Sequence, residues 1–491
     1  MQRKFLTNLG LLLFINLLIK PVWIFGIDLT VQRSVGVTDY GFYSVILNFS
    51  FLFNILLDLG ITNFNNRNIA QNNQLLNKHF EGLLVLKLML AVIYILIIFS
   101  VALILNYSAA QFRLLGWLAF NQFLLSFILY LRSNVSGFLM FRTDSMLSVL
   151  DRVMMILFCG VLLWGGIIDS PFRIEWFVYT QTLAYSITAI TAFMIVVKKA
   201  RFRKLNWNWP FFLMIMKQSA PFALLVLLMT FYNRLDPVMM ESLLPDKTGN
   251  EQAGIYASGF RLLDAANMVA YLFAVLLVPI FSRMLKEKQP VEQMLKLSFT
   301  LIISIASIVS IGLFFYSREV IDLLYDSHIE ESTSVFRLLI PGFIAVSTVN
   351  IFGTLLTANG SFKQLNLIAL SGLVINFILN FILIPKFLAT GSAIASLVTQ
   401  FTMAVLQVII VQKIFRFKVN FRYLITLFVF IAGVIVFNYI SKMFPINWSF
   451  LPTSYSWLGS FTLVLLISVI FASILKLWSF GSLQKILRQD R

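Results

Sequence analysis

The sequence predicts an all-α polytopic membrane protein of about fourteen transmembrane helices. Of its 491 residues, 59% are hydrophobic and only 12% are charged, whereas soluble domains average about 45–50% apolar and about 25% charged residues. The apolar runs are unbroken, unlike the ~10-residue alternating segments of an outer-membrane barrel. This balance excludes a soluble enzyme, a disordered chain and a disulfide scaffold.

Apolar stretches long enough to cross a bilayer, about 20 residues each, recur along the whole chain. The first stretch lacks a small-x-small cleavage site and continues past Lys20-Pro21, so we interpret it as a helix and not as a signal peptide. The predicted spans are 8–28, 41–60, 83–105, 109–131, 145–168, 174–197, 219–243, 255–280, 297–317, 336–357, 364–385, 391–412, 422–440 and 457–477.

The distribution of lysine and arginine tests this count. We place the N-terminus inside and let the sides alternate. Of the 38 basic residues, 23 then fall in inner segments, six in outer segments and nine within the predicted spans. Cytoplasmic segments are the basic ones in membrane proteins, so both termini are predicted to be cytoplasmic. The net charge of +17 then faces anionic membrane lipid, and no nucleic acid is needed as a partner.

The chain has few of the residues that bind metals or cofactors or act as nucleophiles. The chain has one cysteine, Cys159, within an apolar run, and two distant histidines, His79 and His328. We therefore expect no cofactor and no metal. No connection exceeds about 22 residues, so neither side holds a soluble catalytic domain. The most acidic outer segment, between Arg318 and Arg337, is interpreted as a solvated face.

A weak internal repeat divides the chain. Gly41-Phe42-Tyr43 begins the second span and Gly254-Ile255-Tyr256 begins the eighth, an offset of 213 residues and of six spans. An even number of spans gives the two copies the same orientation, and internal repeats are typical of transporters. We predict an N-terminal lobe (1–197, spans 1–6), a basic cytoplasmic linker (198–218), a C-terminal lobe (219–415, spans 7–12), and spans 13–14 with the tail (416–491).

Charged residues at membrane depth mark candidate sites, because a charge at the bilayer centre costs about 2.5–3.5 kcal/mol on insertion scales. The seventh span contains Arg234 and Asp236 followed by Pro237, which is expected to break the helix. Lys20, Arg234 and Arg261 come from spans that the repeat sets facing one another. A cationic cavity predicts an anionic substrate such as a phosphate.

Other intramembrane charges have two interpretations. Arg261 and Asp264 are spaced to pair on one helix face. Asp151 and Arg152 are either a cavity-facing pair or a structural one. Lys87 and Asp58, near span ends, are expected at the membrane interface. Packing signals in the C-terminal half are a tight turn, a pair of asparagines and a small-residue stripe: Asn359-Gly360; Asn376 and Asn380; Gly391, Ala395 and Thr399.

Taken together, several motifs resemble the bacterial polysaccharide-biosynthesis flippases, the Wzx-type exporters of lipid-linked repeat units. Their superfamily also holds the lipid II flippases and the multidrug and toxin extruders. The resemblance covers about 40–415. It rests on Tyr40-Gly41-Phe42-Tyr43, Asp58-Leu59-Gly60 with Arg67 and Ala70, Asn233-Arg234-Leu235-Asp236-Pro237, Gly254-Ile255-Tyr256 with Arg261, Ala358-Asn359-Gly360, and Asn376…Asn380…Ile384-Pro385…Gly391-Ser392-Ala393-Ile394-Ala395.

The resemblance implies a two-lobed transporter that flips an undecaprenyl-diphosphate-linked polysaccharide repeat unit, for O-antigen or exopolysaccharide, by alternating access in the bacterial cytoplasmic membrane. We assign Arg234, Lys20 and Arg261 to the diphosphate, and Asp236 and Asp264 to a coupling ion or proton. A polysaccharide polymerase and glycosyltransferases are the implied protein partners. The alternatives are a multidrug exporter, which would favour an acidic cavity, the lipid II flippase, and a membrane polymerase or ligase.

Overall fold

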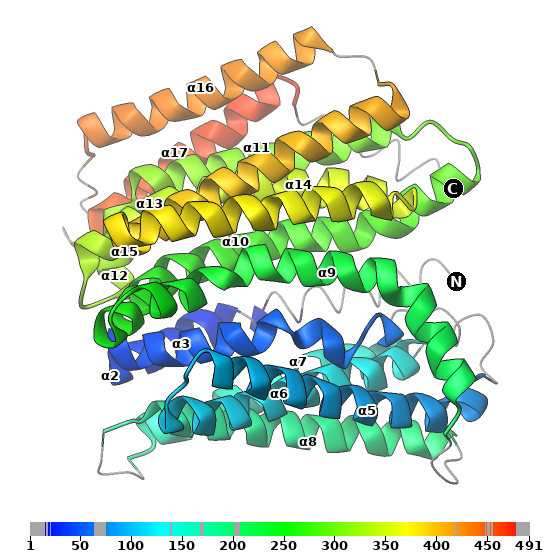
Figure 1. Cartoon of the computed structure of the whole chain (residues 1–491). Coiled ribbons are helices and arrows are strands. Elements are labelled where there is room, and N and C mark those ends of the chain that lie inside the picture. Colours follow the sequence, from blue (N-terminus) through cyan, green and yellow to red (C-terminus); the bar gives the residue numbers. More distant parts are fainter. Residues whose placement is uncertain are drawn as a thin grey trace. The chain divides into compact units, whose positions relative to one another are not determined.

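The computed structural model describes residues 15, 18–19, 21–62, 75–137, 140–166, 171–200, 207–417, 420–446, 448, 452 and 455–477. Every regular element in these ranges is a helix (Figure 1). The all-α prediction is therefore confirmed for the described residues. Lys20 lies outside them, as do Arg67 and Ala70 of the flippase-like motifs.

The chain forms two compact units, Met1–Gly254 and Ile255–Arg491. The boundary falls within α10 (Asp246–Lys286), so its first two turns belong to the first unit. Helix α9 (Trp209–Leu243) also belongs to the first unit because it packs along α3 (Val37–Leu52).

The first unit is built on α6, which packs against α8 and α3, while α7 packs against α8. Phe80, Tyr130, Ala192 and Phe212 form part of one buried cluster that joins four of its helices. Its remaining elements, in chain order, are η1 (Val22–Asp28), α2 (Leu29–Val35), η2 (Asn54–Leu57), α5 (Leu75–Ile104), α6 (Ala109–Gly137), α7 (Phe141–Trp164) and α8 (Ile174–Ala200).

The predicted span 41–60 is not one continuous helix. Helix α3 ends at Leu52, a 3₁₀ turn follows, and the backbone turns at Leu59 and Gly60, where φ is +44° and +83°. The carbonyl of Leu57 accepts hydrogen bonds from the side chains of Lys87 and Ser126. Those two side chains supply hydrogen bonds that a regular helix would have made within its own backbone.

The second unit is organised around α11 and α14. Helix α14 packs against α11 and α15, α13 packs against α15, and α16 and α17 pack on each other and on α11. Its elements after α10 are α11 (Glu292–Phe315), α12 (Ser317–Leu324), α13 (Ile329–Leu339), α14 (Gly342–Ala358), α15 (Phe362–Phe415), α16 (Phe421–Met443) and α17 (Ser456–Ile474).

Two predicted spans lie within the single element α15. The helix passes through Pro385 and breaks at Leu388, where φ is +54° and ψ is −138°. On either side of the break the chain packs closely, since a methyl group on Gly391 would overlap the carbonyl oxygen of Leu383. Ser392 donates to Asn380 (2.8 Å), which donates to Asn376 (3.1 Å). The predicted packing roles of Gly391 and the two asparagines are confirmed.

Replacing Asn380 by alanine is expected to lower the thermal stability of the protein in detergent. Asn380, Asn376 and Ser392 are fully buried. The substitution removes one hydrogen bond to Asn376 and the acceptor of the Ser392 hydroxyl, and a buried hydroxyl that loses its partner costs about 1–3 kcal/mol. The matched control is Asn350→Ala, because the Asn350 amide bonds the Val346 carbonyl of its own helix. Equal melting temperatures for the two variants would contradict this account.

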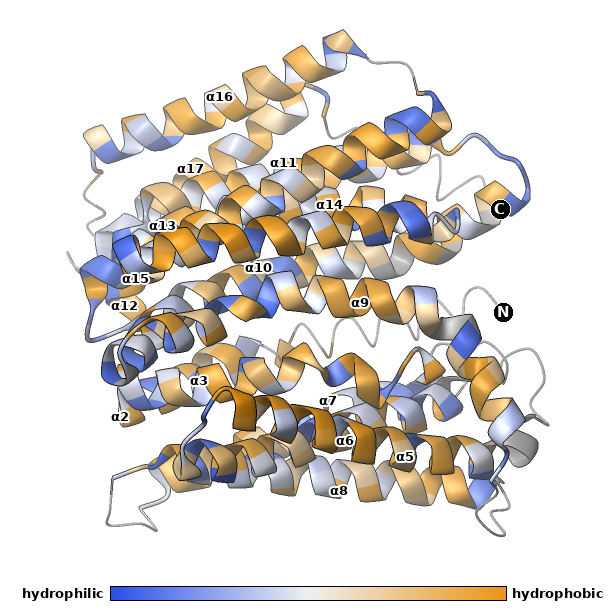
Figure 2. Ribbon diagram, viewed as in Figure 1, coloured by the Kyte–Doolittle hydropathy of each residue, from blue (hydrophilic) through white to orange (hydrophobic). Residues whose placement is uncertain are grey.

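Ten helices among the described residues are long and apolar enough to cross a membrane. Hydrophobic residues dominate α5, α15 and α16 along most of their length (Figure 2). The ten are Phe80–Ile104, Ala109–Val135, Arg142–Trp164, Ile174–Lys199, Ala220–Leu243, Glu292–Phe315, Ile329–Ala358, Phe362–Phe415, Phe421–Met443 and Ser456–Ile474. In this count α13 and α14 form one continuous stretch, and the broken α15 is counted once. The protein is thus a multi-pass membrane protein.

Candidate functional site

The strongest sequence candidate, Arg234, lies on α9. This helix begins where the Asn208 side chain accepts a hydrogen bond from the Phe211 amide (3.1 Å). It continues through Pro237 to Leu243, so the expected break at Pro237 was wrong. A proline keeps helical φ, and in a packed membrane helix the carbonyl that it frees is satisfied by neighbouring groups.

Arg234 is half-buried, and its guanidinium carbon lies 5.5 Å from the ring centroid of Phe51 on α3. One turn earlier on α9, Phe231 packs edge-on against Phe53 (centroids 5.6 Å apart). Asp236 follows on a different face and is 1% exposed. The Phe51 ring of α3 therefore lies against the Arg234 guanidinium while part of the Arg234 side chain stays accessible.

Arg261, on α10 in the second unit, is nearly buried, at 8% exposure. Its Nη1 donates to the Tyr325 hydroxyl (2.9 Å), which donates to the Ser258 carbonyl (3.2 Å). Asp264 lies three residues further along the same helix and is half-buried. Within the described contacts, Arg261 is anchored by Tyr325.

The pair Asp151–Arg152, on α7, belongs to an aromatic cluster of the first unit. The Arg152 guanidinium lies 3.8 Å from the Asp151 carboxylate and donates to the Tyr185 hydroxyl (3.0 Å). Its central carbon is 5.6 Å from the ring of Trp23, which stacks on Phe177 (5.8 Å). These contacts join α7 with η1 and α8.

The same cluster contains an acid that sequence reasoning missed. Asp28 accepts a hydrogen bond from the Tyr40 hydroxyl (3.0 Å), and Gln181 donates to the Tyr43 hydroxyl (2.9 Å). Asp28 is the last residue of the first predicted span, a position where an acid usually meets water. The sequence signal was that Asp28 ends the first predicted span and Tyr40 directly precedes the second, which places both residues at the same predicted end of consecutive spans.

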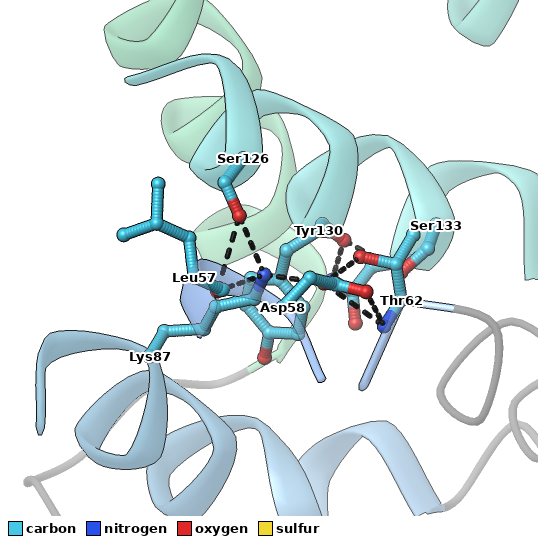
Figure 3. Close-up of polar contacts among 8 residues, drawn as sticks. Leu57, Asp58, Thr62, Lys87, Ser126, Tyr130 and Ser133 are labelled. Carbon is cyan, nitrogen blue, oxygen red and sulfur yellow. Dashed lines mark hydrogen bonds and ion pairs between the residues drawn. The ribbon is translucent and has the colours of Figure 1, made fainter. Parts of the chain in front are cut away.

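Lys87 and Asp58 are not at a solvated interface as expected, because Lys87 is 2% exposed. Figure 3 shows its ammonium among the Asp58 carboxylate (2.5 Å), the Leu57 carbonyl (3.0 Å) and the Ser126 hydroxyl (2.9 Å). The Asp58 carboxylate also accepts a hydrogen bond from the Thr62 hydroxyl. The unwound end of α3 creates acceptors that need a buried cation, so this ion pair is structural.

Within the described residues, no three His, Cys, Asp or Glu side chains are placed to hold a metal ion. Acidic residues of the segment between Arg318 and Arg337 form ion pairs: Arg318 pairs with Glu330 (2.6 Å) and His328 with Glu331 (2.7 Å). Glu319 pairs with Lys442 on α16. These contacts fit the predicted solvated face.

The family model described as "Polysaccharide biosynthesis protein" matches residues 6–285, more than half of the chain. The chain belongs to the polysaccharide biosynthesis protein family. It is therefore a transporter and not an enzyme, which removes the polymerase or ligase alternative. No curated protein matches the chain.

Solved structures give the fold of this family member. A structure of the lipid II flippase MurJ in an inward closed conformation matches with a TM-score of 0.70 at 12% identity, covering 95% of this chain and 98% of that one. An inward-facing multidrug resistance transporter of the MATE family matches with a TM-score of 0.62 at 13% identity, covering 79% and 93%. A MOP superfamily transporter from Pyrococcus furiosus, for which a binding pocket of reverse polarity is described, matches at 0.56 and 12% identity, covering 83% and 93%. The polysaccharide biosynthesis protein thus has the MOP superfamily fold.

Proposed function

We propose that this protein flips an undecaprenyl-diphosphate-linked polysaccharide repeat unit from the inner to the outer leaflet of the bacterial cytoplasmic membrane. The single observation that carries the proposal is a half-buried arginine at membrane depth, Arg234, in a chain of the polysaccharide biosynthesis family. A diphosphate is the anionic part of such a substrate, and a guanidinium binds phosphate oxygens through charge-assisted hydrogen bonds.

The proposed architecture has fourteen spans, with two six-helix lobes of parallel orientation, the linker 198–218 and two peripheral C-terminal helices. In it, α15 supplies two spans on either side of Leu388, and α3 and α10 supply one each. The basic residues favour cytoplasmic termini. The repeat supports lobes that rock about a central site in alternating access.

Within this mechanism Arg234 holds the diphosphate together with Lys20 and Arg261, which the repeat places on corresponding or neighbouring spans. Asp236 and Asp264 are the proposed carriers of a coupling ion or proton. A buried carboxylate at membrane depth requires a cation, a proton or a polar partner. A carboxylate that binds a cation or proton on one side of the membrane and releases it on the other would couple that ion to transport. A polymerase and glycosyltransferases are the proposed partners, since they handle the same lipid-linked glycan.

The test is the leaflet distribution of lipid-linked oligosaccharide in cells lacking the gene. Lipid extracts and surface-accessible labelling should show undecaprenyl-diphosphate-linked repeat units accumulating in the inner leaflet, with loss of surface glycan. Restoration by the plasmid-borne gene is the control. An unchanged lipid pool with intact surface glycan would overturn the proposal and favour export of drugs by the same fold.

A further inference from the structure

The two copies of the glycine motif contact each other. An offset of 213 residues relates Gly41 to Gly254 and Val37 to Asn250. A methyl group on Gly41 would overlap the carbonyl oxygen of Asn250 and lie 2.8 Å from the amide nitrogen of Gly254. A methyl group on Gly254 would overlap the carbonyl oxygen of Val37. The offset of 213 residues converts the first contact into the second, because Gly41 with Asn250 corresponds to Gly254 with Val37. Helix α3 and the first turns of α10 therefore meet symmetrically.

At this contact the two helix backbones touch, and the small Val37 side chain packs beside Gly254. Glycines on facing helices let backbones approach until no third group fits between them. Because backbone atoms and one small side chain form the glycine contact, the helices can part without moving large side chains past one another. Gln32, at 1% exposure, lies at this contact and donates to the Gly254 carbonyl (3.4 Å).

A second contact accompanies the glycines. Gln111, at the start of α6, donates to the carboxylate of Glu241 at the end of α9 (2.7 Å). Burial, together with the nearby Glu241 carboxylate, raises the pKa of Tyr107 in the loop before α6. In the predicted topology, the residues of the glycine contact and of the Gln111–Glu241 contact lie at the outer ends of their spans. Both contacts join the predicted N-terminal lobe to the predicted C-terminal lobe.

We propose that the Gly41–Gly254 contact is the outer gate of the transporter, closed in this structure and parted when the substrate leaves. The proposal rests on the proposed function and topology. Alternating access requires a seal on one side that opens while the other side closes. A close backbone contact formed by both copies of the glycine motif meets that need.

Cysteine accessibility tests the gate without using the substrate. In a Cys159→Ala background, Gln32→Cys reports the space behind the contact, and a membrane-impermeant maleimide is added to intact cells. Gly41→Ala and Gly254→Ala should each raise labelling severalfold, because the added methyl forces the helices apart. The matched control is Gly116→Ala, where the methyl meets no atom within 4 Å. Labelling that stays at the parental level in both glycine variants would overturn the proposal.

A second pair keeps the test decisive if the glycine variants fail to reach the membrane. Gln111→Cys and Glu241→Cys, combined in the same background, should be joined by a short bifunctional thiol reagent. Cross-linking should stop glycan export, and a reducible linker should restore it on reduction; single-cysteine variants serve as controls. Undiminished export by the cross-linked protein would also overturn the gate. If labelling responds as expected but gene deletion leaves lipid-linked glycan unchanged, the proposed function fails and the gate stands.

Discussion

Replacement of Arg234 by alanine is expected to abolish export of the lipid-linked glycan while leaving the amount of protein in the membrane near normal. A hydrogen-bonded charge contributes about 1.5–3 kcal/mol, equivalent to roughly 10- to 150-fold in binding. Arg234→Lys should retain part of the activity, because a phosphate accepts a point charge. Surface glycan and inner-leaflet lipid, measured in complemented deletion cells, give the readout.

Two further variants separate binding from packing. Phe51→Leu removes the ring beneath the guanidinium and keeps the charge, so most of the export should remain. Arg318→Ala removes a cation that is 67% exposed and should export normally. Full export activity in Arg234→Ala would show that Arg234 is not part of the proposed diphosphate site. Loss of export in Phe51→Leu would show that the packing of Phe51, and not only the charge of Arg234, is required for activity.

The second large effect concerns stability. Lys87→Met is expected to destabilise the first unit by about 3 kcal/mol, because it leaves the Asp58 carboxylate and the Leu57 carbonyl without their cation. This value is at the lower end for a broken buried pair, since 23% of the Asp58 side chain is exposed. Thermal unfolding in detergent and protein levels in membranes measure it.

A double substitution distinguishes the ion pair from loss of packing. Adding Asp58→Asn to Lys87→Met removes the uncompensated charge, so part of the stability should return. Lys363→Met, at an exposed lysine, should change the melting temperature little. If the single and double variants melt together, the lysine stem and not its charge stabilises this region.

The overall fold was predictable because hydropathy and the alternation of basic residues are properties of long segments. The same patterns could not reveal the end of α3, since Leu52, Phe53 and Leu57 continue an apolar run across the break. The break depends on Lys87 and Ser126, which are 30 and 69 residues away from the carbonyl that they bind. The sequence predicted Lys87 at the membrane interface, because the acceptors that hold it in the interior come from residues distant in the chain.

The candidate site was predictable in part. A charge within an apolar run marks Arg234 from composition alone, but its contact with Phe51 requires the packing of α9 along α3. Asp28 was not predicted as a site residue, because a carboxylate at the end of a span is usually solvated. The predicted break at Pro237 was wrong, since α9 continues through this residue to Leu243.

The symmetry of the glycine contact has a consequence for how such a chain arises. In a twofold homodimer, residue i of one subunit contacts residue j of the other, and j contacts i. Val37 with Gly254 and Gly41 with Asn250 follow that rule within one polypeptide. In the proposed architecture of two six-helix lobes, it is the contact that two separate subunits would form about an axis along the membrane normal. Joining them by a linker would require no new interface at this point.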